Sequence, residues 1–109
     1  MIEQQQRFNV PPALLALEWS GKNITVSKRV CVPVGSHDNV PYVLRGVIYY
    51  GSLHYVTVLV FGNGQLWYYD GMRNDGNMRL IGDLRSAPDL SRVEGKTAVA
   101  AIYIRDRPV

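Results

Sequence analysis

Short apolar runs separated by turn-forming residues make up most of the chain from residue 13 onward. The runs are rich in Val, Ile, Leu, Tyr and Thr, and Gly, Asn, Asp and Pro stand between them, which is typical of β-strands joined by turns. The pattern predicts strands at Ala13–Trp19, Asn23–Ser27, Arg29–Pro33, Tyr42–Tyr50, His54–Phe61, Gln65–Asp70, Met78–Ile81 and Thr97–Arg105. We therefore expect a mainly β fold, built as an antiparallel sheet with little helix.

The segments between these runs carry the residues that turns require. Residues 20–23 (SGKN) and 61–65 (FGNGQ) predict hairpin turns, because Gly and Asn adopt a positive φ at low cost. Residues 35–41 (GSHDNVP) predict a longer surface loop, and residues 86–95 (SAPDLSRVEG) predict one helical turn with Ser86 as its cap. The polar residues 1–10 predict a loose arm ahead of a single domain at residues 11–109.

Two of the predicted strands are apolar at almost every position. These are residues 42–50 (YVLRGVIYY) and 97–104 (TAVAAIYI), and such runs are typical of strands that are covered on both faces. A β domain of 109 residues seldom covers two strands on both faces by itself. Because an exposed apolar face of that extent usually marks an interface, we expect self-association through it, or pairing with a separate chain.

Composition narrows the class of protein. The chain has 109 residues, 47% of them hydrophobic and 19% charged, which predicts one folded domain and argues against disorder. Nothing in it approaches the roughly 18 uninterrupted apolar residues of a membrane span. The single cysteine, Cys31, excludes an internal disulfide and favours a reducing compartment, the cytoplasm or nucleus. The formal net charge of +3 is scattered along the chain and identifies no partner.

Residues 54–70 predict a hairpin that turns about Asn63, with a histidine and an aspartate at its open end. One register pairs His54 with Asp70, Val56 with Tyr68, and Val58 with Leu66. Side chains two positions apart share a face, and directly opposed Cβ atoms lie ~4.5–5.5 Å apart, within reach of an imidazole–carboxylate hydrogen bond. A slip of one residue would place His54 and Asp70 on opposite faces.

Such a pair is suited to proton transfer. A carboxylate on one ring nitrogen fixes the tautomer and supports the imidazolium, so that the other nitrogen can take a proton from a Cys or Ser side chain. The same two residues also fit a simpler interpretation, in which His54 ends a strand and Asp70 with Gly71 forms a turn.

Five segments stand in a characteristic order: PPALLALEW (11–19), RVCVPV (29–34), YVLRGVIYYGSLHYVTVLV (42–60), LWYYDG (66–71) and AVAAIYIR (98–105). This series resembles the C-terminal half of the catalytic domain of ubiquitin-specific proteases, a papain-like cysteine peptidase fold. The resemblance implies a highly twisted antiparallel sheet, the palm half of that fold. It also implies His54 as the catalytic base and Asp70 as the residue that orients it. Tyr55, Tyr69, Tyr103 and Arg105 fall on aromatic and basic positions of the same motifs.

The nucleophile of that family has no counterpart here. Its box, of the type G-N-T-C-Y, has no match in the chain, and Cys31 lies between valines in a predicted strand, where we expect a buried structural thiol. Ser36, Ser52 and Ser91 lack the G-x-S-x-G elbow of a serine nucleophile. Leu53 replaces the glycine usually found before the histidine, and Glu18 with Trp19 replaces an Arg-Phe signature.

Metal and cofactor sites are not predicted. The cysteine pairs of the family's zinc-binding fingers are absent, and the chain has only two histidines, His37 and His54. The His37–Asp38 pair fits a turn in a polar loop. We therefore expect no cofactor and no bound metal.

Three functions remain open from the sequence. The favoured one is a non-catalytic module derived from a ubiquitin-specific protease, inactive alone, that binds ubiquitin, a ubiquitin-like protein or itself. The second is the His/Asp half of an active deubiquitinase, a thiol-dependent hydrolase completed by a chain that carries the nucleophile. The third is a basic β module for nucleic acid, with Trp67, Tyr68 and Tyr69 as stacking platforms beside Arg73 and Arg79, although such aromatic residues more often serve packing.

Overall fold

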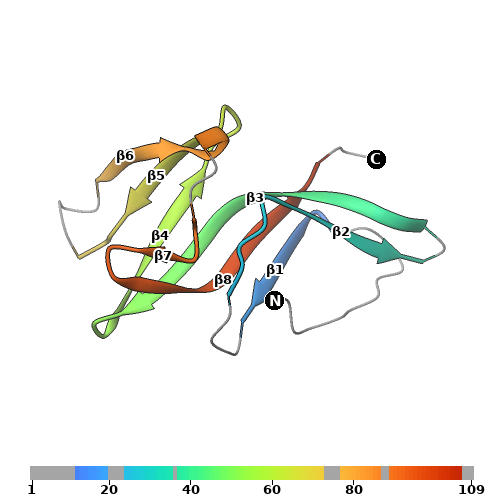
Figure 1. Cartoon of the computed structure of the whole chain (residues 1–109). Helices are drawn as coiled ribbons and strands as arrows, with labels where there is room; N and C mark the ends of the chain where they lie inside the picture. Colours follow the sequence, from blue (N-terminus) through green and yellow to red (C-terminus); the bar gives the residue numbers. More distant parts are fainter. Residues whose placement is uncertain (1–11, 20–23, 36, 73–76, 87–88, 107–109) are drawn as a thin grey trace.

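The computed structural model describes residues 12–19, 24–35, 37–72, 77–86 and 89–106, and these form one antiparallel sheet (Figure 1). Its strands are β1 (Leu14–Glu18), β2 (Arg29–Val34), β3 (His37–Gly51), β4 (His54–Val60), β5 (Gln65–Tyr69), β6 (Met78–Asp83), β7 (Arg92–Val93) and β8 (Lys96–Arg105). In the described ranges the only helical element is a 3₁₀ turn, η2 (Leu84–Ser86). The prediction of a mainly β, antiparallel fold with little helix is confirmed.

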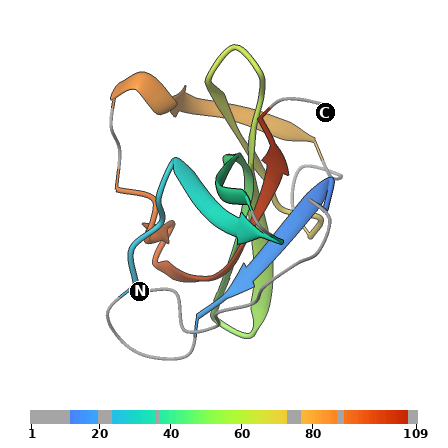
Figure 2. The same ribbon diagram turned by 90° about the vertical axis from the view of Figure 1, so that its right-hand side faces the viewer.

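The strand order is β1-β8-β3-β4-β5-β6, with β2 paired to β3 and β7 paired to β8. The long strand β3 lies at the centre, because it pairs with β8 on one side and with β4 and β2 on the other. Figures 1 and 2 together show a strongly twisted sheet, in which β6 at one edge runs in a very different direction from β1 at the other. No helix in the described part of the chain is long and apolar enough to cross a membrane.

The prediction of a surface loop at residues 35–41 is wrong. Strand β3 already begins at His37, and only a tight turn at Gly35, with φ 54°, separates it from β2. His37 and Asp38 are therefore strand residues and not a turn. The physical reason is that the alternating residues of β2 find a partner in this segment, with Val32 opposite Val40.

Two other predicted elements also differ. Residues 24–27 form no strand, and the helical turn lies at Leu84–Ser86, so that it ends at Ser86 and does not begin there. Arg92 and Val93, predicted within that helical segment, pair with the start of β8. The Glu94–Gly95 turn that joins them has φ 50° and 76°, which matches the type I′ geometry of a two-residue hairpin. The predicted arm at 1–10 and the turn at 20–23 lie outside the described residues.

The sheet has one buried face, which we call the inner face. Along β4 and β5 every second residue is buried, which fits the period-two alternation of a strand with one covered side. The buried core is made of Leu15, Tyr42, Leu44, Val47, Tyr49, Val56, Val58, Val60, Leu66, Tyr68, Leu90, Ala98, Ala101 and Tyr103. Ile24, Val26, Leu84 and Val93, from the segments that flank the sheet, pack against it.

Three buried tyrosines tie neighbouring segments to the sheet. The hydroxyl of Tyr103 donates a hydrogen bond to the Ser27 carbonyl at 2.7 Å, and that of Tyr49 donates to the Leu90 carbonyl at 2.8 Å. The hydroxyl of Tyr42 donates to the Pro12 carbonyl at 2.7 Å. Burial raises the pKa of Tyr103 to about 12 and raises the pKa of Tyr49 as well. Each ring thus fills the core while its polar end is satisfied.

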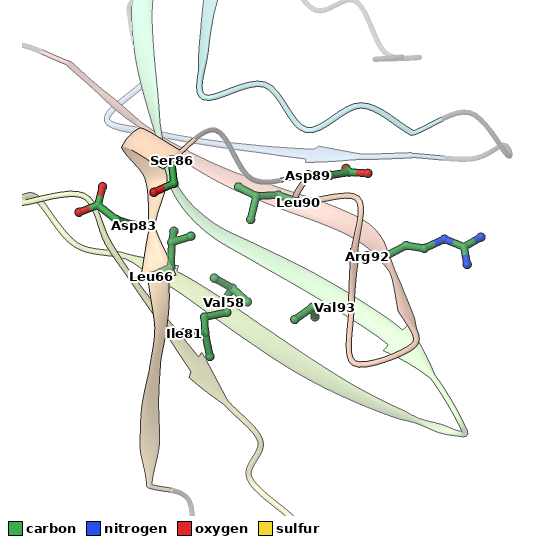
Figure 3. A pocket seen from close by; sticks show the side chains of 10 residues that line it. Val58, Leu66, Ile81, Asp83, Ser86, Asp89, Leu90, Arg92 and Val93 are labelled. Carbon is green, nitrogen blue, oxygen red and sulfur yellow. The ribbon is translucent and has the colours of Figure 1, made fainter.

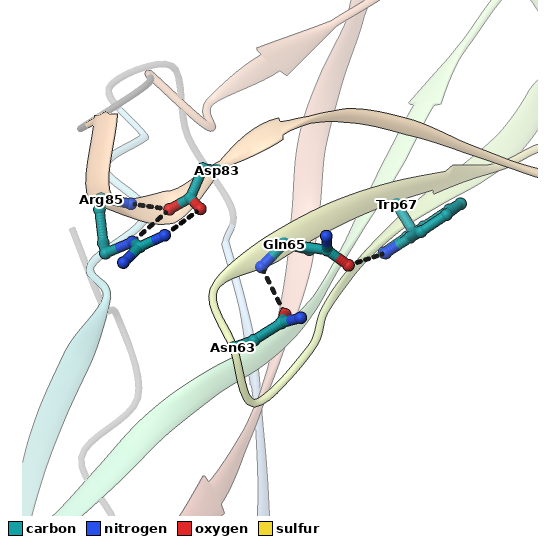
Figure 4. A network of polar contacts seen from close by, with 5 residues as sticks. All are labelled: Asn63, Gln65, Trp67, Asp83 and Arg85. Atoms are coloured by element: carbon teal, nitrogen blue, oxygen red, sulfur yellow. Dashed lines mark hydrogen bonds and ion pairs between the residues drawn. The ribbon is translucent and has the colours of Figure 1, made fainter.

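The turn between β4 and β5 is held by backbone and side-chain contacts (Figure 4). Phe61 N donates to the Gln65 carbonyl, and the Asn63 side-chain oxygen accepts a hydrogen bond from Gln65 N at 3.0 Å. Gly64 has φ 89°, and its carbonyl accepts a hydrogen bond from Leu84 N, so the turn also anchors η2. The predicted hairpin turn at 61–65 is therefore present.

Candidate functional site: a histidine–aspartate pair

The β4–β5 hairpin has a different register from the one that pairs His54 directly with Asp70. Val58 lies opposite Tyr68 and Val60 opposite Leu66, so the strands are shifted by two residues. The observed register follows from the closure of the turn, in which Phe61 N donates to the Gln65 carbonyl. Figure 4 shows the second bond of this turn, from Gln65 N to the Asn63 side chain. A shift of two residues preserves the side on which each side chain lies. His54 and Asp70 consequently remain on the same face, as diagonal neighbours.

The two side chains are in contact. Nε2 of His54 lies 3.1 Å from Oδ2 of Asp70, within hydrogen-bonding distance. The Asp70 side chain is 3% exposed and the His54 side chain 19% exposed, so the carboxylate is enclosed while the imidazole keeps some contact with solvent. The structure thus brings together the two residues that the sequence singled out.

Asp70 also forms the turn that follows β5. Its Oδ1 atom accepts a hydrogen bond from the Met72 backbone N at 2.9 Å, while Oδ2 faces the imidazole. The two interpretations of Asp70 from the sequence are therefore compatible, because one carboxylate oxygen serves the turn and the other the histidine. The turn bond fixes the orientation of the carboxylate toward His54.

His54 is positioned by a tight turn with unusual backbone geometry. It begins β4 and pairs with Gly51, the last residue of β3, across a two-residue turn. Ser52 and Leu53 in that turn have φ 52° and 66°, which is the left-handed region that favours Gly or Asn. The backbone is therefore strained immediately before the imidazole.

The ring nitrogen Nδ1 of His54 is the one left for other chemistry. Asp70 occupies the Nε2 side, and among the described residues no hydrogen bond reaches Nδ1. A neutral imidazole whose Nε2–H donates to the carboxylate would carry its lone pair on Nδ1. This arrangement can accept a proton from a group that approaches Nδ1.

Lys96 is a neighbour of this site that sequence reasoning missed. It begins β8 and is only 5% exposed. A Cβ atom added to Gly51 would lie 2.9 Å from Cγ and 3.2 Å from Cα of Lys96, so the lysine packs directly on the residue that pairs with His54. A glycine inside a strand pattern often marks such a close approach, and that is the signal Gly51 offered.

Cys31 is not placed to act with His54. It lies in β2 opposite Pro41, whereas His54 lies opposite Gly51 at the far end of β3. Ten residues of strand separate the two levels, which corresponds to about 30 Å. The expectation that Cys31 is buried is wrong: the side chain is exposed, because β2 pairs only with β3 among the described strands.

The other candidate residues take no part in the pair. The Ser91 hydroxyl donates to Asp89 at 2.7 Å, and Ser36 lies outside the described residues. Tyr55 alternates with His54 along β4 and is exposed on the opposite face, where its ring packs on that of Tyr50 at 4.6 Å. No group of three potential metal ligands occurs in the ranges that the structure describes.

The aromatic run 67–69 does not present three platforms on one surface. Tyr68 is buried, and the Arg79 guanidinium stacks over its ring at 4.9 Å while also pairing with Glu94. Arg73 lies outside the described residues. Base stacking would therefore be limited to the alternate positions Trp67 and Tyr69.

A hollow of about 360 Å³ lies on the inner face between β4, β5, β6 and residues 89–93 (Figure 3). The side chains of Val58, Leu66, Ile81, Leu90 and Val93 line it. Figure 3 shows the polar ends of Asp83, Asp89 and Arg92 directed away from these apolar groups. The hollow is therefore mainly apolar near its floor, and Val58 on that floor lies four residues along β4 from the histidine.

Comparison of the chain with family models, with curated proteins and with solved structures finds no match in any of the three.

Proposed function

We propose that this chain is the base-bearing half of a cysteine-peptidase fold of the ubiquitin-specific-protease type, and that alone it serves as a non-catalytic module that binds ubiquitin or a ubiquitin-like protein. The observation that carries the proposal is the 3.1 Å contact between His54 Nε2 and Asp70 Oδ2. Its support is chemical, because an enclosed carboxylate that holds one ring nitrogen is the arrangement by which a base is oriented in cysteine and serine hydrolases.

We expect the isolated chain to be inactive because of the position of its thiol. Covalent catalysis by a Cys–His pair requires the two side chains to come within hydrogen-bonding reach. The sequence contains one cysteine, and about 30 Å of strand separates its level in the sheet from that of His54. The pair can orient an imidazole here, but no thiol of this chain reaches it.

Binding is tested by titrating unlabelled ubiquitin into the ¹⁵N-labelled chain and following amide shifts. We expect concentration-dependent shifts, with a subset at the end of the sheet that carries His54 and Asp70. A second titration with a ubiquitin-like protein separates a general from a specific interaction. An unchanged spectrum with both proteins at high concentration would contradict the proposed binding function.

A second candidate is the His/Asp half of a deubiquitinase that another chain or segment completes. The observation that favours it is the Nδ1 atom of His54, which has no hydrogen-bond partner among the described residues. Hydrolysis of a fluorogenic ubiquitin substrate would be measured for the chain alone and after mixing with candidate nucleophile-bearing proteins. Activity that survives His54→Ala, or that the chain shows alone and keeps after Cys31→Ser, would contradict the assigned roles.

A further inference from the structure

The face of the sheet opposite His54 is unusually apolar, and we call it the outer face. Ten large hydrophobic residues are exposed in the described part of the chain, and the alternation and pairing of the strands place seven of them on this face. These seven are Leu14, Tyr50, Tyr55, Phe61, Tyr69, Met78 and Leu80. The other three, Leu53, Met72 and Ile81, lie in turns or on the inner side of β6.

Two neighbouring rows of paired residues cross all six strands of this face. The first row runs Leu80–Trp67–Leu59–Gly46–Ile102–Ala16, and the second runs Met78–Tyr69–Thr57–Ile48–Ala100–Glu18. Of these twelve residues only Glu18, on the edge strand β1, is charged. The centre of the outer face is thus a continuous uncharged surface.

The area of this surface matches that of a protein interface. The seven exposed residues retain between 39% and 62% of their accessible surface. At roughly 200 Å² for each side chain, they leave about 650 Å² of apolar surface open. That exceeds the ~300–600 Å² of the largest patch on a typical monomer. With the half-buried residues of the two rows, it approaches the ~800 Å² that each partner contributes to a standard interface.

We propose that a second copy of this chain covers the outer face, so that two sheets pack outer face to outer face in a symmetric two-layer dimer. In such a symmetric contact each patch meets the same patch of the other copy, so a charge near the two-fold axis would face a like charge. The two rows carry no charge except Glu18 at the edge, and they therefore meet this condition. Charged side chains outside the two rows form ion pairs with one another, namely Arg29–Asp106, Arg79–Glu94 and Arg85–Asp83.

The proposed packing agrees with the physics of β-sheets. Two twisted sheets that face each other pack about 10 Å apart, with their side chains interdigitated. Tyr55 and Tyr50, whose rings are in tilted contact, lie near one end of the face, and Leu80 lies across the sheet on β6. The dimer would leave the inner side of the sheet, which carries His54 and Asp70, uncovered. This inference is therefore independent of the proposed function.

Sedimentation equilibrium tests the dimer from about 1 µM to about 500 µM protein. We expect the wild-type mass to rise from monomer to dimer over this range. Tyr55→Lys and Leu80→Lys, which introduce a charge at two separate places on the outer face, should each weaken association at least tenfold. Leu53→Lys is the matched control, because Leu53 is 89% exposed but lies in the turn before His54; it should associate like wild type.

Three results would overturn the proposal. The first is a wild-type chain that stays monomeric over the whole range, as expected if a different protein covers the face. The second is a dimer that resists both lysine variants. The third is a dimer that Leu80→Lys dissociates and Tyr55→Lys does not, which would place the contact at the β6 edge. All three variants change exposed positions, so each should fold. Circular dichroism spectra that match the wild-type spectrum would confirm this.

Discussion

The contact between His54 and Asp70 has a measurable energetic consequence. The perturbation is a double-mutant cycle built from His54→Ala, Asp70→Ala and the double variant. Asp70 is almost fully enclosed, and a hydrogen bond to a charged group contributes about 1.5–3 kcal/mol to stability. Because the imidazole is partly exposed, we place the coupling free energy near the lower end of that range, at about 1.5 kcal/mol.

The cycle separates this contact from the other role of Asp70. Asp70→Ala also removes the bond to Met72 N, so the single variant should cost about 2–3 kcal/mol. The Met72 contribution is lost in both Asp70→Ala and the double variant, and therefore cancels in the coupling. The free energy of unfolding would be measured by urea denaturation, which suits a small domain of this kind.

A matched cycle on the Arg79–Glu94 pair provides the control. Its side chains are 53% and 45% exposed, and pairs of that exposure contribute about 0.2–1 kcal/mol. The coupling of His54 with Asp70 should exceed that of the control pair. A His54–Asp70 coupling below about 0.3 kcal/mol, the level at which independent residues are additive, would refute the reasoning.

Three further outcomes follow from the same structure. Gly51→Ala should destabilise the fold by about 1–2 kcal/mol, because the added Cβ meets Lys96 at 2.9 Å, whereas Gly46→Ala, whose nearest contact is 3.7 Å, should be nearly neutral in the same urea assay. Leu53→Gly should raise the melting temperature, because glycine adopts the positive φ of this position without the strain of about 1 kcal/mol that a side chain incurs there. A lower melting temperature would contradict this. The contribution of Tyr103 to stability should be constant below pH ~9 and be lost between about pH 10 and the raised pKa of Tyr103, about 12, because the phenol ionises at lower pH in the unfolded chain. Tyr103→Phe should therefore reduce the alkaline fall of the urea midpoint.

The alternation of apolar residues was sufficient to predict the central strands. In β4 and β5 every second side chain is buried, and the same periodicity allows a register with His54 and Asp70 on one face, although a slip of one residue would separate them. The register itself was not predictable from that periodicity. A turn at 61–65 can close in two ways that leave the same residues inward, and hydrogen bonds at Phe61, Asn63 and Gln65 decide between them.

Features that depend on distant segments could not be predicted from the sequence. Residues 35–41 contain Gly, Asp, Asn and Pro, which favour a loop locally, but pairing with β2 extends β3 through most of them. The approach of Lys96 to Gly51 joins residues 45 positions apart. The glycine indicates that something packs closely there, but no local pattern identifies Lys96 as the residue that does so. The exposure of Cys31 likewise depends on which strands flank β2, and not on the valines beside it.

The central claim is that Asp70 holds His54 through Nε2 and leaves Nδ1 as the proton acceptor. A long-range ¹H–¹⁵N correlation spectrum at about pH 9, where an ordinary imidazole is neutral, reports the tautomer directly. The chain has only two histidines, so His37→Gln assigns the signals. We predict that His54 carries its proton on Nε2 with a bare Nδ1, and that Asp70→Ala removes this preference. A proton on Nδ1 of His54 in the wild-type protein, or a spectrum indifferent to Asp70→Ala, would contradict the account.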